Sequence, residues 1–399
     1  MNRNWERCFE VVRKKERTVI GLMSGTSLDG LDIALCSMSG NGPGTMVRLL
    51  NFRTLSYEEI FKSEVKAIFS RKDADLELVC LMNAKIGRMH AKMVLDVLSD
   101  WNVDPSEVDV IASHGQTIFH APASLHGRAG YPNATLQIGD GDHLAVGTGI
   151  LTISDFRQKH IAAGGEGAPL AVYGDYLLFS GKGEDRVMLN IGGIANFTYL
   201  PSDQDASRVF STDVGPGNTL MDQFVQQHYP GLYYDKDAVL AGKGRLSGAL
   251  LDELMRTPFL ALDFPKTTGP ELFNLDFLEA AQQRSGTTDL APEDILATLC
   301  RFSADVIAAA VVRCLGAGAS FAIYLSGGGM HHPLLVARLK ELLPLARFGS
   351  TQDLGIDPDA KEAVLFALLA NEALSGVPVD FGTRAGVPAV TMGKISLPF

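Results

Sequence analysis

The sequence predicts an α/β protein of two domains, and three observations lead to that prediction. The chain has 399 residues, which is more than one hydrophobic core usually serves. Apolar runs with strand character at 18–23 and 31–38 flank a short turn that is rich in glycine. The same plan of strand, glycine turn and strand returns at 187–200, although the letters differ. We therefore expect two related domains, each built around one of these hairpins.

The first turn, 24–30, has the composition of a phosphate site. It reads Ser-Gly-Thr-Ser-Leu-Asp-Gly. Glycine lets the backbone turn tightly and approach a ligand, and successive backbone N–H groups in such a turn can surround an anion. The hydroxyl groups add donors, while Asp29 and Asp32 offer the carboxylate oxygens that a hydrated Mg²⁺ prefers. The alternative is an ordinary hairpin turn made of small residues.

This turn differs from the commoner phosphate loops, because it lacks the lysine of a Walker A loop and is followed by a strand instead of a helix. A strand–turn–strand unit around phosphate is typical of actin, the large heat-shock chaperones and sugar kinases. Two more glycine clusters, Gly192–Gly193 and Gly327–Gly329, also follow apolar strand-like runs. Three unrelated tight turns would be the alternative. We expect the two domains to face each other over one nucleotide.

The remaining elements follow from periodicity and from breaker residues. Helical spacing of apolar residues predicts helices at 56–70 and 75–99. In the first half we also expect strands at 108–112 and 150–154, and a helix after 135–140. In the second half we expect a helix from 218 to 227, an apolar helix at 293–314, a buried strand at 321–325, a helix from Pro333 and a last helix beginning at Asp357–Pro358.

These elements suggest where the domains begin and end. We place the first domain at 18–155, joined by the C-terminal segment 376–399. The second domain, which would bind the nucleotide, takes 156–375. Residues 1–17 are expected to form a short helix or a frayed extension.

Composition limits the class of partner and the compartment. A net charge of −11 and a pI near 5.3 argue against nucleic acid or an anionic membrane as the main partner. The five cysteines are scattered without a CxxC pair, which favours a reducing compartment. The charged start lacks the apolar core of a secretory signal, and glycines and Arg313 interrupt the apolar stretch 304–325. We expect a cytoplasmic protein.

Polar residues follow two predicted strands at positions where α/β folds usually bind ligands. The segment Ser-His-Gly-Gln-Thr at 113–117 follows one strand, and Asp155 follows the other, just before a glycine-rich segment. A carboxylate in that place can accept a proton from a nucleophile. The alternatives for Asp155 are a helix cap or an ion pair with Arg157.

Two other polar features predict less. The histidines lie on separate segments, and adjacent residues such as His331 and His332 do not share a helix face, so we do not expect a metal site. The loop 266–274 could cover a substrate or cap the helix that follows it, and the sequence does not choose between these roles.

Together these motifs resemble the anhydro-N-acetylmuramic acid kinase family of the actin-like ATPase superfamily. The resemblance covers nearly the whole chain in the family's order and implies a two-domain, ribonuclease H-like fold with a central nucleotide cleft. The matching segments are 21–32, Ser113–Thr117, Thr135–Asp140, Asp155–Arg157, Gly164–Leu170, Asn190–Thr198, Asp213–Asn218, Pro265–Gly269, Ser326–Gly329 and Asp359–Ala363.

The resemblance implies a reaction in cell-wall (peptidoglycan) recycling. ATP and water would act on 1,6-anhydro-N-acetylmuramic acid to give N-acetylmuramic acid 6-phosphate and ADP, with Asp155 as the base that activates water. Mg²⁺ would arrive with ATP, with Asp29 and Asp213 beyond its direct ligands. We expect small-molecule substrates, a homodimer, and neither nucleic acid nor membrane as partner. The predicted substrate contacts are His114, Gln116, Gln137, Arg157 and Glu362.

The ATP contacts implied by the same resemblance lie in both halves of the chain. They are Gly25, Thr26, Ser27, Leu28, Asp29, Gly30, Leu31, Asp32, Gly192, Gly193, Gly215, Gly217, Asn218, Gly327, Gly328 and Gly329.

A single base would suffice for the reaction that the resemblance implies. Glycoside cleavage normally needs an acid for the leaving oxygen as well as a base for water. Here the leaving O6 could attack phosphorus directly, so the phosphoryl group would take the place of the proton. Positioning and charge stabilisation supply most of the catalysis in phosphoryl transfer.

Four positions depart from the family pattern: Glu166 replaces a usual Gln, His160 an acidic residue, Pro270 an Arg and His332 an Asn. Two competing functions stay open at this point. One is another sugar or carboxylate kinase of the same fold, and the other is a nucleotide-switched binding protein of the actin or chaperone kind. ATP consumption that depends strictly on the anhydro sugar separates the first hypothesis from both.

Overall fold

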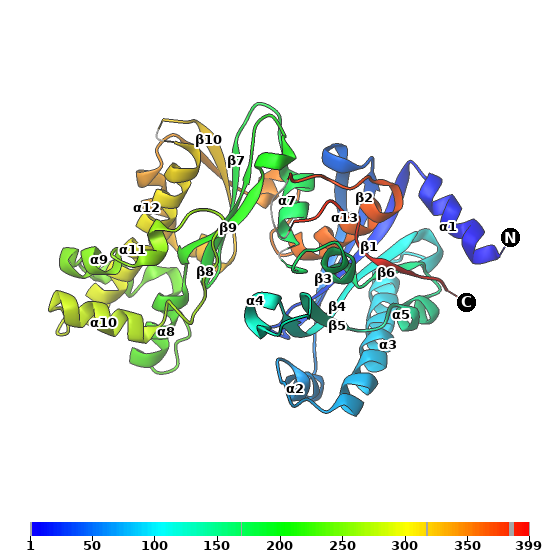
Figure 1. The fold of residues 1–399 in the computed structure, drawn as a ribbon, viewed down its shortest axis with the longest axis horizontal. Helices are drawn as coiled ribbons and strands as arrows, with labels where there is room; N and C mark the ends of the chain where they lie inside the picture. The colour runs from blue at the N-terminus through cyan, green and yellow to red at the C-terminus, as the bar shows by residue number, and fades with distance from the viewer. Residues whose placement is uncertain (1, 169, 317, 383–386, 399) are drawn as a thin grey trace. The chain divides into compact units, whose positions relative to one another are not determined.

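The computed structural model describes residues 2–168, 170–316, 318–382 and 387–398. The chain forms two compact units (Figure 1). Unit 1 contains residues 1–179 and 355–399, and unit 2 contains residues 180–354. The predicted division assigned 156–179 and 355–375 to the second domain. In the structure both segments belong to unit 1, where the last long helix, α13 (Lys361–Ser375), packs on the sheet.

Unit 1 is built on a seven-stranded sheet with the order β12-β6-β4-β1-β2-β3 and with β5 paired to β4. The first three strands form an antiparallel meander, β4 and β6 add in parallel, and β5 and β12 are antiparallel to their neighbours. The bounds are β1 (Glu16–Ser24), β2 (Gly30–Ser39), β3 (Met46–Ser56), β4 (Val110–Ala121), β5 (Ala134–Ile138), β6 (Thr152–Ser154) and β12 (Lys394–Ser396).

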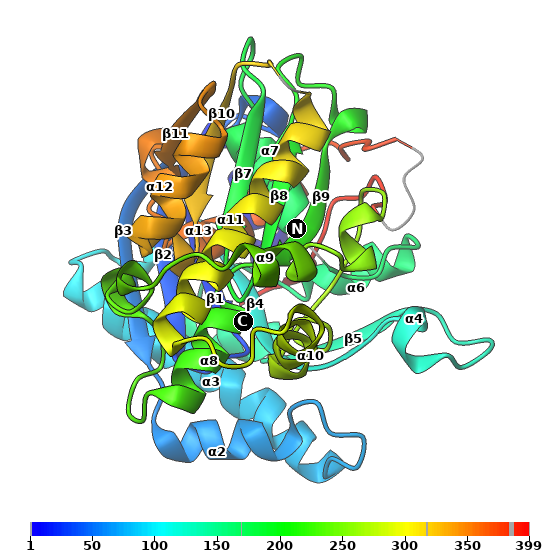
Figure 2. The same cartoon turned by 90° about the vertical axis from the view of Figure 1, so that its left-hand side faces the viewer.

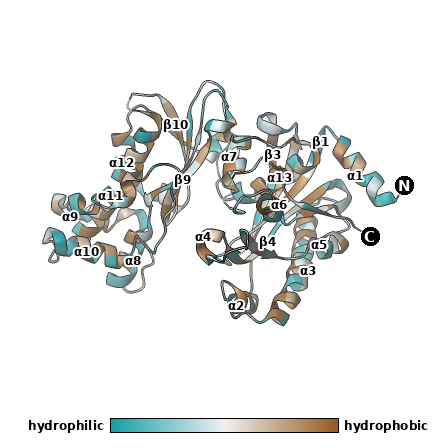
Figure 3. Ribbon diagram, in the orientation of Figure 1, coloured by the Kyte–Doolittle hydropathy of each residue, from teal (hydrophilic) through white to brown (hydrophobic). Residues whose placement is uncertain are grey.

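Helices cover this sheet on both faces, and that explains the continuous apolar run in β1. Ile20 and Leu22 belong to a core that includes buried residues of α3, while an added Cβ at Gly21 would meet the carbonyl of Ala363 in α13 at 1.9 Å. Side chains alternate across a strand, and a strand buried on both sides has no polar face. Strands β1 and β2 are accordingly buried over most of their length; Figure 3 colours the chain by hydropathy.

The helices of unit 1 include those predicted at 56–70, at 75–99 and after 135–140. They are α1 (Arg3–Arg13), α2 (Glu59–Ile68), α3 (Leu76–Asp100), α4 (Ala123–His126), α5 (Gly141–Thr148), α6 (Phe156–Ala162), α7 (Ala171–Phe179) and α13. The last helix begins at Lys361, later than predicted, because residues 358–360 form a turn, with the N–H of Ala360 donating to the carbonyl of Asp357.

Unit 2 is built on a five-stranded sheet with the order β11-β10-β7-β8-β9. Helices α11 and α12 lie across this sheet (Figure 2). The bounds are β7 (Arg186–Ile191), β8 (Ile194–Leu200), β9 (Phe210–Pro216), β10 (Phe321–Ser326), β11 (Ala346–Ser350), α8 (Thr219–His228), α9 (Gly248–Leu254), α10 (Leu275–Ser285), α11 (Pro292–Leu315) and α12 (Pro333–Leu342).

By length and composition, α11 is the one helix of the described residues that could cross a membrane, but 72% of its most apolar window is buried. Its side chains Leu296, Leu299, Phe302 and Ile307 belong to the core of unit 2. Asn274, the last residue of the loop 266–274, caps α10, because its Oδ1 atom accepts from the N–H of Phe277. The other expected role of this loop, covering a substrate, stays a hypothesis.

The two sheets repeat one topology. In each, an antiparallel meander of three strands comes first, and two further strands then add in parallel beside the first strand, so β3-β2-β1-β4-β6 corresponds to β9-β8-β7-β10-β11. Each predicted hairpin starts one of these sheets. The predicted fold class, two α/β units of ribonuclease H-like topology, is confirmed.

Candidate active site

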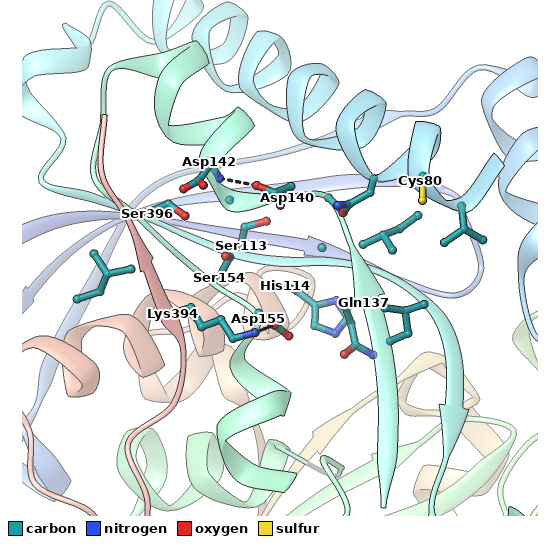
Figure 4. A pocket seen from close by; sticks show the side chains of 18 residues that line it. Cys80, Ser113, His114, Gln137, Asp140, Asp142, Ser154, Asp155, Lys394 and Ser396 are labelled. Carbon is teal, nitrogen blue, oxygen red and sulfur yellow. Dashed lines mark hydrogen bonds and ion pairs between the residues drawn. The ribbon is translucent and has the colours of Figure 1, made fainter. Parts of the chain in front are cut away.

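Unit 1 contains a cavity of about 470 Å³ beside the carboxyl end of β6. We call it the Asp155 pocket (Figure 4). Its size lies in the ordinary range for small-molecule sites. It is lined by Ser113–Gly115 of β4, 136–142 from β5 to the start of α5, Ser154 and Asp155 after β6, Lys394–Ser396 of β12, and Val79, Cys80 and Asn83 of α3.

Asp155 stands between β6 and α6 with a φ of 55°. Most L-residues avoid this left-handed conformation, but Asp and Asn tolerate it. Neither alternative raised by the sequence is found among the described residues: the side chain makes no capping hydrogen bond to α6, and its ion pair is with Lys394 instead of Arg157. Asp155 is 26% exposed at its side chain and lines the pocket.

Lys394 is a site residue that the sequence did not indicate. Strand β12 pairs antiparallel with β6, which sets Lys394 opposite Ser154, and its Nζ contacts the Oδ2 atom of Asp155 (Figure 4). Gly393 precedes it with a φ of 105°, at a point where a Cβ would meet Ile153 at 2.4 Å. Lys394 lies 239 positions after Asp155, and a strand of three residues has no local pattern that would indicate this contact.

His114 and Arg157, both predicted to contact substrate, contact each other. The Nε–H of Arg157 donates to Nε2 of His114 at 3.1 Å, and its Nη1 donates to the carbonyl of Gly167 at 2.7 Å. His114 is 4% exposed, and burial, assisted by the Arg157 charge, lowers its pKa to about 3. It is therefore neutral at pH 7 and carries its proton on Nδ1.

Two residues that line the pocket each have a buried polar atom to which the described residues give no hydrogen bond. Within the described residues, Nδ1 of His114 and Oε1 of Gln137 are buried without a hydrogen-bond partner, although Nε2 of Gln137 donates to the hydroxyls of Thr117 and Thr135. Both residues line the Asp155 pocket and lie side by side in Figure 4. Buried polar groups are rarely left unpaired, so this pair is suited to a ligand that both accepts and donates.

Gln116 is not directed at the pocket. It is fully buried within β4, where it accepts from the hydroxyl of Ser24 at 2.6 Å and donates to the carbonyl of Gly25 at 3.3 Å. The segment 113–117, predicted to follow a strand, lies inside β4, because pairing with β5 extends that strand to Ala121.

The predicted phosphate turn connects β1 and β2. Thr26, Ser27 and Asp29 are exposed, whereas Leu28 and Leu31 are core residues at 3% and 0% exposure. Because both leucine side chains are buried, only their backbone groups could contact a phosphate. Leu28 also has a φ of 61°, an uncommon conformation for a large side chain and one that clusters at functional sites.

Acidic residues gather beside this turn. The hydroxyl of Thr54 donates to Asp32 at 2.5 Å. Burial, followed by the nearby charges of Asp359 and Asp29, raises the pKa of Asp32, and burial together with the Asp32 charge raises that of Glu362. A divalent cation would relieve this repulsion. Among the described residues no group of three or more His, Cys, Asp or Glu side chains could hold a metal by itself.

Unit 2 brings its three predicted glycine segments into one cluster. The N–H groups of Gly217 and Asn218 donate to the carbonyls of Gly193 and Gly192, both at 2.9 Å. Nδ2 of Asn218 donates to the carbonyl of Ile191, and its Oδ1 would lie 2.9 Å from a Cβ at Gly329. Segments that are far apart in sequence are thus packed together around Asn218.

The glycines of these turns divide into two groups. Gly215, Gly217, Gly327 and Gly329 are needed by the fold, since a Cβ would come within 2.6 Å of another atom. By contrast, Gly25, Gly193 and Gly328 have room for a Cβ, with no neighbour nearer than 3.5 Å, and none has a positive φ. The fold does not require glycine at the second group of positions. A ligand that approaches the backbone closely would require it.

A second cavity of about 420 Å³ adjoins the cluster in unit 2. It is lined by Asn218, Met221, Asp222, 234–237, Gly328, His331 and His332. Asp213, in contrast, accepts from the N–H of Thr268 at 2.9 Å, and burial raises its pKa.

Two departures from the family pattern have structural roles. Nδ1 of His332 accepts from the N–H of Leu335 at 3.2 Å, which caps α12. Nδ1 of His160 accepts from the N–H of Gly167 at 3.0 Å. Glu166 and Pro270, the other two departures, are exposed.

Comparison with known proteins agrees with the resemblance. The sequence model of the anhydro-N-acetylmuramic acid kinase family matches residues 17–396. Proteins named anhydro-N-acetylmuramic acid kinase are 55% identical in Pseudoalteromonas atlantica (100% of each chain covered) and 50% identical in Pseudoalteromonas translucida (99% of each chain). The one from Caldanaerobacter subterraneus is 36% identical, covering 98% of this chain and 100% of its own. This chain therefore belongs to the anhydro-N-acetylmuramic acid kinase family.

Proposed function

We propose that this chain uses ATP and water to convert 1,6-anhydro-N-acetylmuramic acid into N-acetylmuramic acid 6-phosphate. The observation that carries the proposal is Asp155, held on one oxygen by Lys394 at the edge of a small-molecule pocket. With Oδ2 occupied in this way, we assign Oδ1 to the reacting water. Membership in the family supports this substrate, and the size and lining of the Asp155 pocket support the proposal that the reaction takes place there.

In the proposed reaction the oxygen of water forms a bond to C1 of the sugar while Asp155 takes its proton. The C1–O6 bond breaks, and its electrons stay on O6. O6 then attacks the γ-phosphorus of ATP, and ADP leaves. No separate acid is needed, because phosphorus takes the place that a proton has in ordinary glycoside cleavage.

His114 and Gln137 support binding of the sugar in the Asp155 pocket. The free N–H of His114 suits a sugar oxygen, and the free carbonyl oxygen of Gln137 suits a hydroxyl or amide N–H. Arg157 orients His114 through their hydrogen bond.

For ATP, we propose that the phosphates bind along residues 25–32 and that the glycine cluster of unit 2 and its 420 Å³ cavity bind the nucleoside. The spare room at Gly25, Gly193 and Gly328 supports this assignment. Asp29 and Asp32 would hold the waters of a Mg²⁺ that comes with ATP, and the resemblance implies the same role for Asp213. The ion would neutralise charge on the transferred phosphoryl group. A cytoplasmic homodimer stays a prediction from the resemblance.

An ATPase assay with and without 1,6-anhydro-N-acetylmuramic acid tests the function, with the position of the product phosphate read by ³¹P and ¹H NMR. We expect ADP release to depend on the anhydro sugar and the phosphate to be on O6. ADP release without the sugar, or with a non-anhydro sugar at an equal rate, would refute the proposal.

A further inference from the structure

A chain of buried hydrogen bonds runs beneath the phosphate turn, from the middle of α3 to both ends of the turn. Its members are His90 of α3, Tyr57 just after β3, Ser24 at the end of β1 and Gln116 of β4. All four are at most 5% exposed. The distances are 3.0 Å from Nε2 of His90 to the hydroxyl of Tyr57, 2.8 Å from that hydroxyl to Oγ of Ser24, and 2.6 Å from Oγ to Oε1 of Gln116.

The direction of every proton in this chain is fixed by one end. Nε2 of Gln116 faces the carbonyl oxygens of Gly25 and Thr117, which only accept. Oε1 of Gln116 must therefore accept from Ser24, Ser24 from Tyr57, and Tyr57 from His90. This arrangement requires a proton on Nε2 of His90. Burial lowers the pKa of His90 to about 4 and raises that of Tyr57, so the same arrangement holds at physiological pH.

The chain reaches the turn at two points. Gln116 donates to the carbonyl of Gly25 at 3.3 Å, and the backbone N–H of Tyr57 donates to the carbonyl of Asp29 at 3.3 Å. Gly25 and Asp29 are the two flanks of the exposed segment Thr26–Ser27. Within the turn, the N–H of Leu28 donates to the carbonyl of Gly25 at 3.4 Å. The turn is therefore fixed from below.

We propose that His90 and Tyr57 are positioning residues for ATP, acting through Ser24 and Gln116 on the geometry of the turn 24–30. Placing four polar side chains in a core is costly unless each is satisfied, and here each hydrogen bond restrains the next. Phosphoryl transfer depends mainly on position, so a turn that is displaced by removal of one link binds the phosphates less well. The inference rests on the proposed ATP role of the turn.

The test is Tyr57→Phe, which removes one hydroxyl and keeps the ring. We expect KM for ATP to rise about tenfold, the usual worth of one buried hydrogen bond, while KM for the anhydro sugar stays within about twofold. Tyr173→Phe is the matched control, because Tyr173 is also buried in unit 1 and donates its hydroxyl to the carbonyl of Pro388 at 2.8 Å. It should change neither KM.

His90 provides the second arm. His90→Leu should resemble Tyr57→Phe, and His90→Gln, whose amide can still donate to Tyr57, should restore ATP binding in part. Binding of a non-hydrolysable ATP analogue by calorimetry, without sugar, gives the same ranking independently of turnover. A wild-type protein that binds the analogue but does not act on the anhydro sugar would refute the proposed function and leave this inference standing.

Three results would overturn the inference. One is an unchanged KM for ATP in folded Tyr57→Phe and His90→Leu. Another is an equal rise of both KM values, which would indicate general loosening. The third is that neither variant folds, which would assign the hydrogen-bond chain to stability alone.

Discussion

Lys394 contacts the carboxylate of Asp155, which the proposed mechanism needs in one orientation. Its ion pair with Asp155 is largely exposed, with the lysine side chain 65% accessible, and exposed pairs add little to stability. We predict that Lys394→Gln lowers kcat roughly tenfold through misplacement of the base, with an unchanged melting temperature. Lys394→Arg should retain most activity.

Lys92→Gln is the control for that substitution. Lys92 forms an exposed pair with Asp96 on α3 and lies outside the Asp155 pocket. If Lys394→Gln and Lys92→Gln have the same kcat as the wild type, the lysine has no part in positioning Asp155.

A substitution at Gly25 tests whether the turn 24–30 binds the phosphates of ATP. A Cβ at this position meets nothing nearer than Ser27 Oγ at 3.5 Å, so Gly25→Ala should leave stability unchanged or raise it by up to about 1 kcal/mol, because alanine reduces the entropy of the unfolded chain. We predict weaker ATP binding in calorimetry. Gly44→Ala, where the Cβ would also meet nothing, should bind ATP normally, and equal affinities of both variants would remove Gly25 from the site.

At the scale of elements, α1 is attached to unit 1 through Arg17. The guanidinium donates to the carbonyls of Val11 and Val12 at the end of α1 and to Asn371 of α13 at 3.0 Å. Arg17 is 3% exposed. The helix lies before the family-matched range, which begins at 17, and this contact gives it a structural role that the sequence did not indicate.

We predict that Arg17→Met destabilises unit 1 by about 3 kcal/mol, because two carbonyls and an amide lose their donor in a buried place. Activity per folded molecule should be preserved. Arg48→Met, which removes only an exposed pair with Glu16 at 3.7 Å, should change stability by less than about 0.5 kcal/mol. Equal unfolding midpoints in urea for both variants would contradict this account of α1.

Elements with strong local patterns could be predicted from the sequence, and elements made by distant pairing could not. The hairpins, α3 and α11 have apolar spacing that identifies them within a dozen residues. Strand β12 has three residues and exists only because β6 offers an edge. The site follows the same rule: Asp155 and the glycine turns stand out by composition, whereas Lys394, Tyr57 and His90 acquire their roles only in the folded chain.

At the scale of the whole molecule, three buried histidines make stability depend on pH. Burial lowers the pKa of His90 and His160 to about 4 and that of His114 to about 3. Their unfolded values lie near 6.5. A lowered folded pKa means that stability is fully present above about pH 6.5 and is lost as the pH falls toward 4. Burial raises the pKa of Asp222 to about 6, so the contribution of Asp222 to stability changes with pH in the opposite direction and is lost as the pH rises.

We predict that each of these histidines lowers the free energy of unfolding by about 2 kcal/mol when the pH falls from 7 to 5. The variant His160→Gln, which keeps an acceptor for Gly167, isolates one of them. Its loss of unfolding free energy over this interval should be smaller than that of the wild type by about 2 kcal/mol. If the free energies of unfolding of the two proteins depend on pH in the same way, His160 is not buried in its neutral form.

The repeated sheet topology shows how far a hairpin motif that occurs twice in the sequence predicts the fold. Two strand–turn–strand units correctly predicted two α/β units of the same class, while the arrangement of the units about a shared nucleotide stays a prediction. The central claim nevertheless concerns a single carboxylate in unit 1.

The most direct test of that claim is turnover and melting temperature of Asp155→Asn measured on one preparation. Asparagine tolerates the left-handed backbone of this position and keeps the size of the side chain, so the melting temperature should match the wild type. If Asp155 is the base, kcat on the anhydro sugar should fall by roughly 10²–10⁴-fold, with much smaller changes in ATP and sugar affinity. A folded Asp155→Asn protein with wild-type turnover would contradict the account.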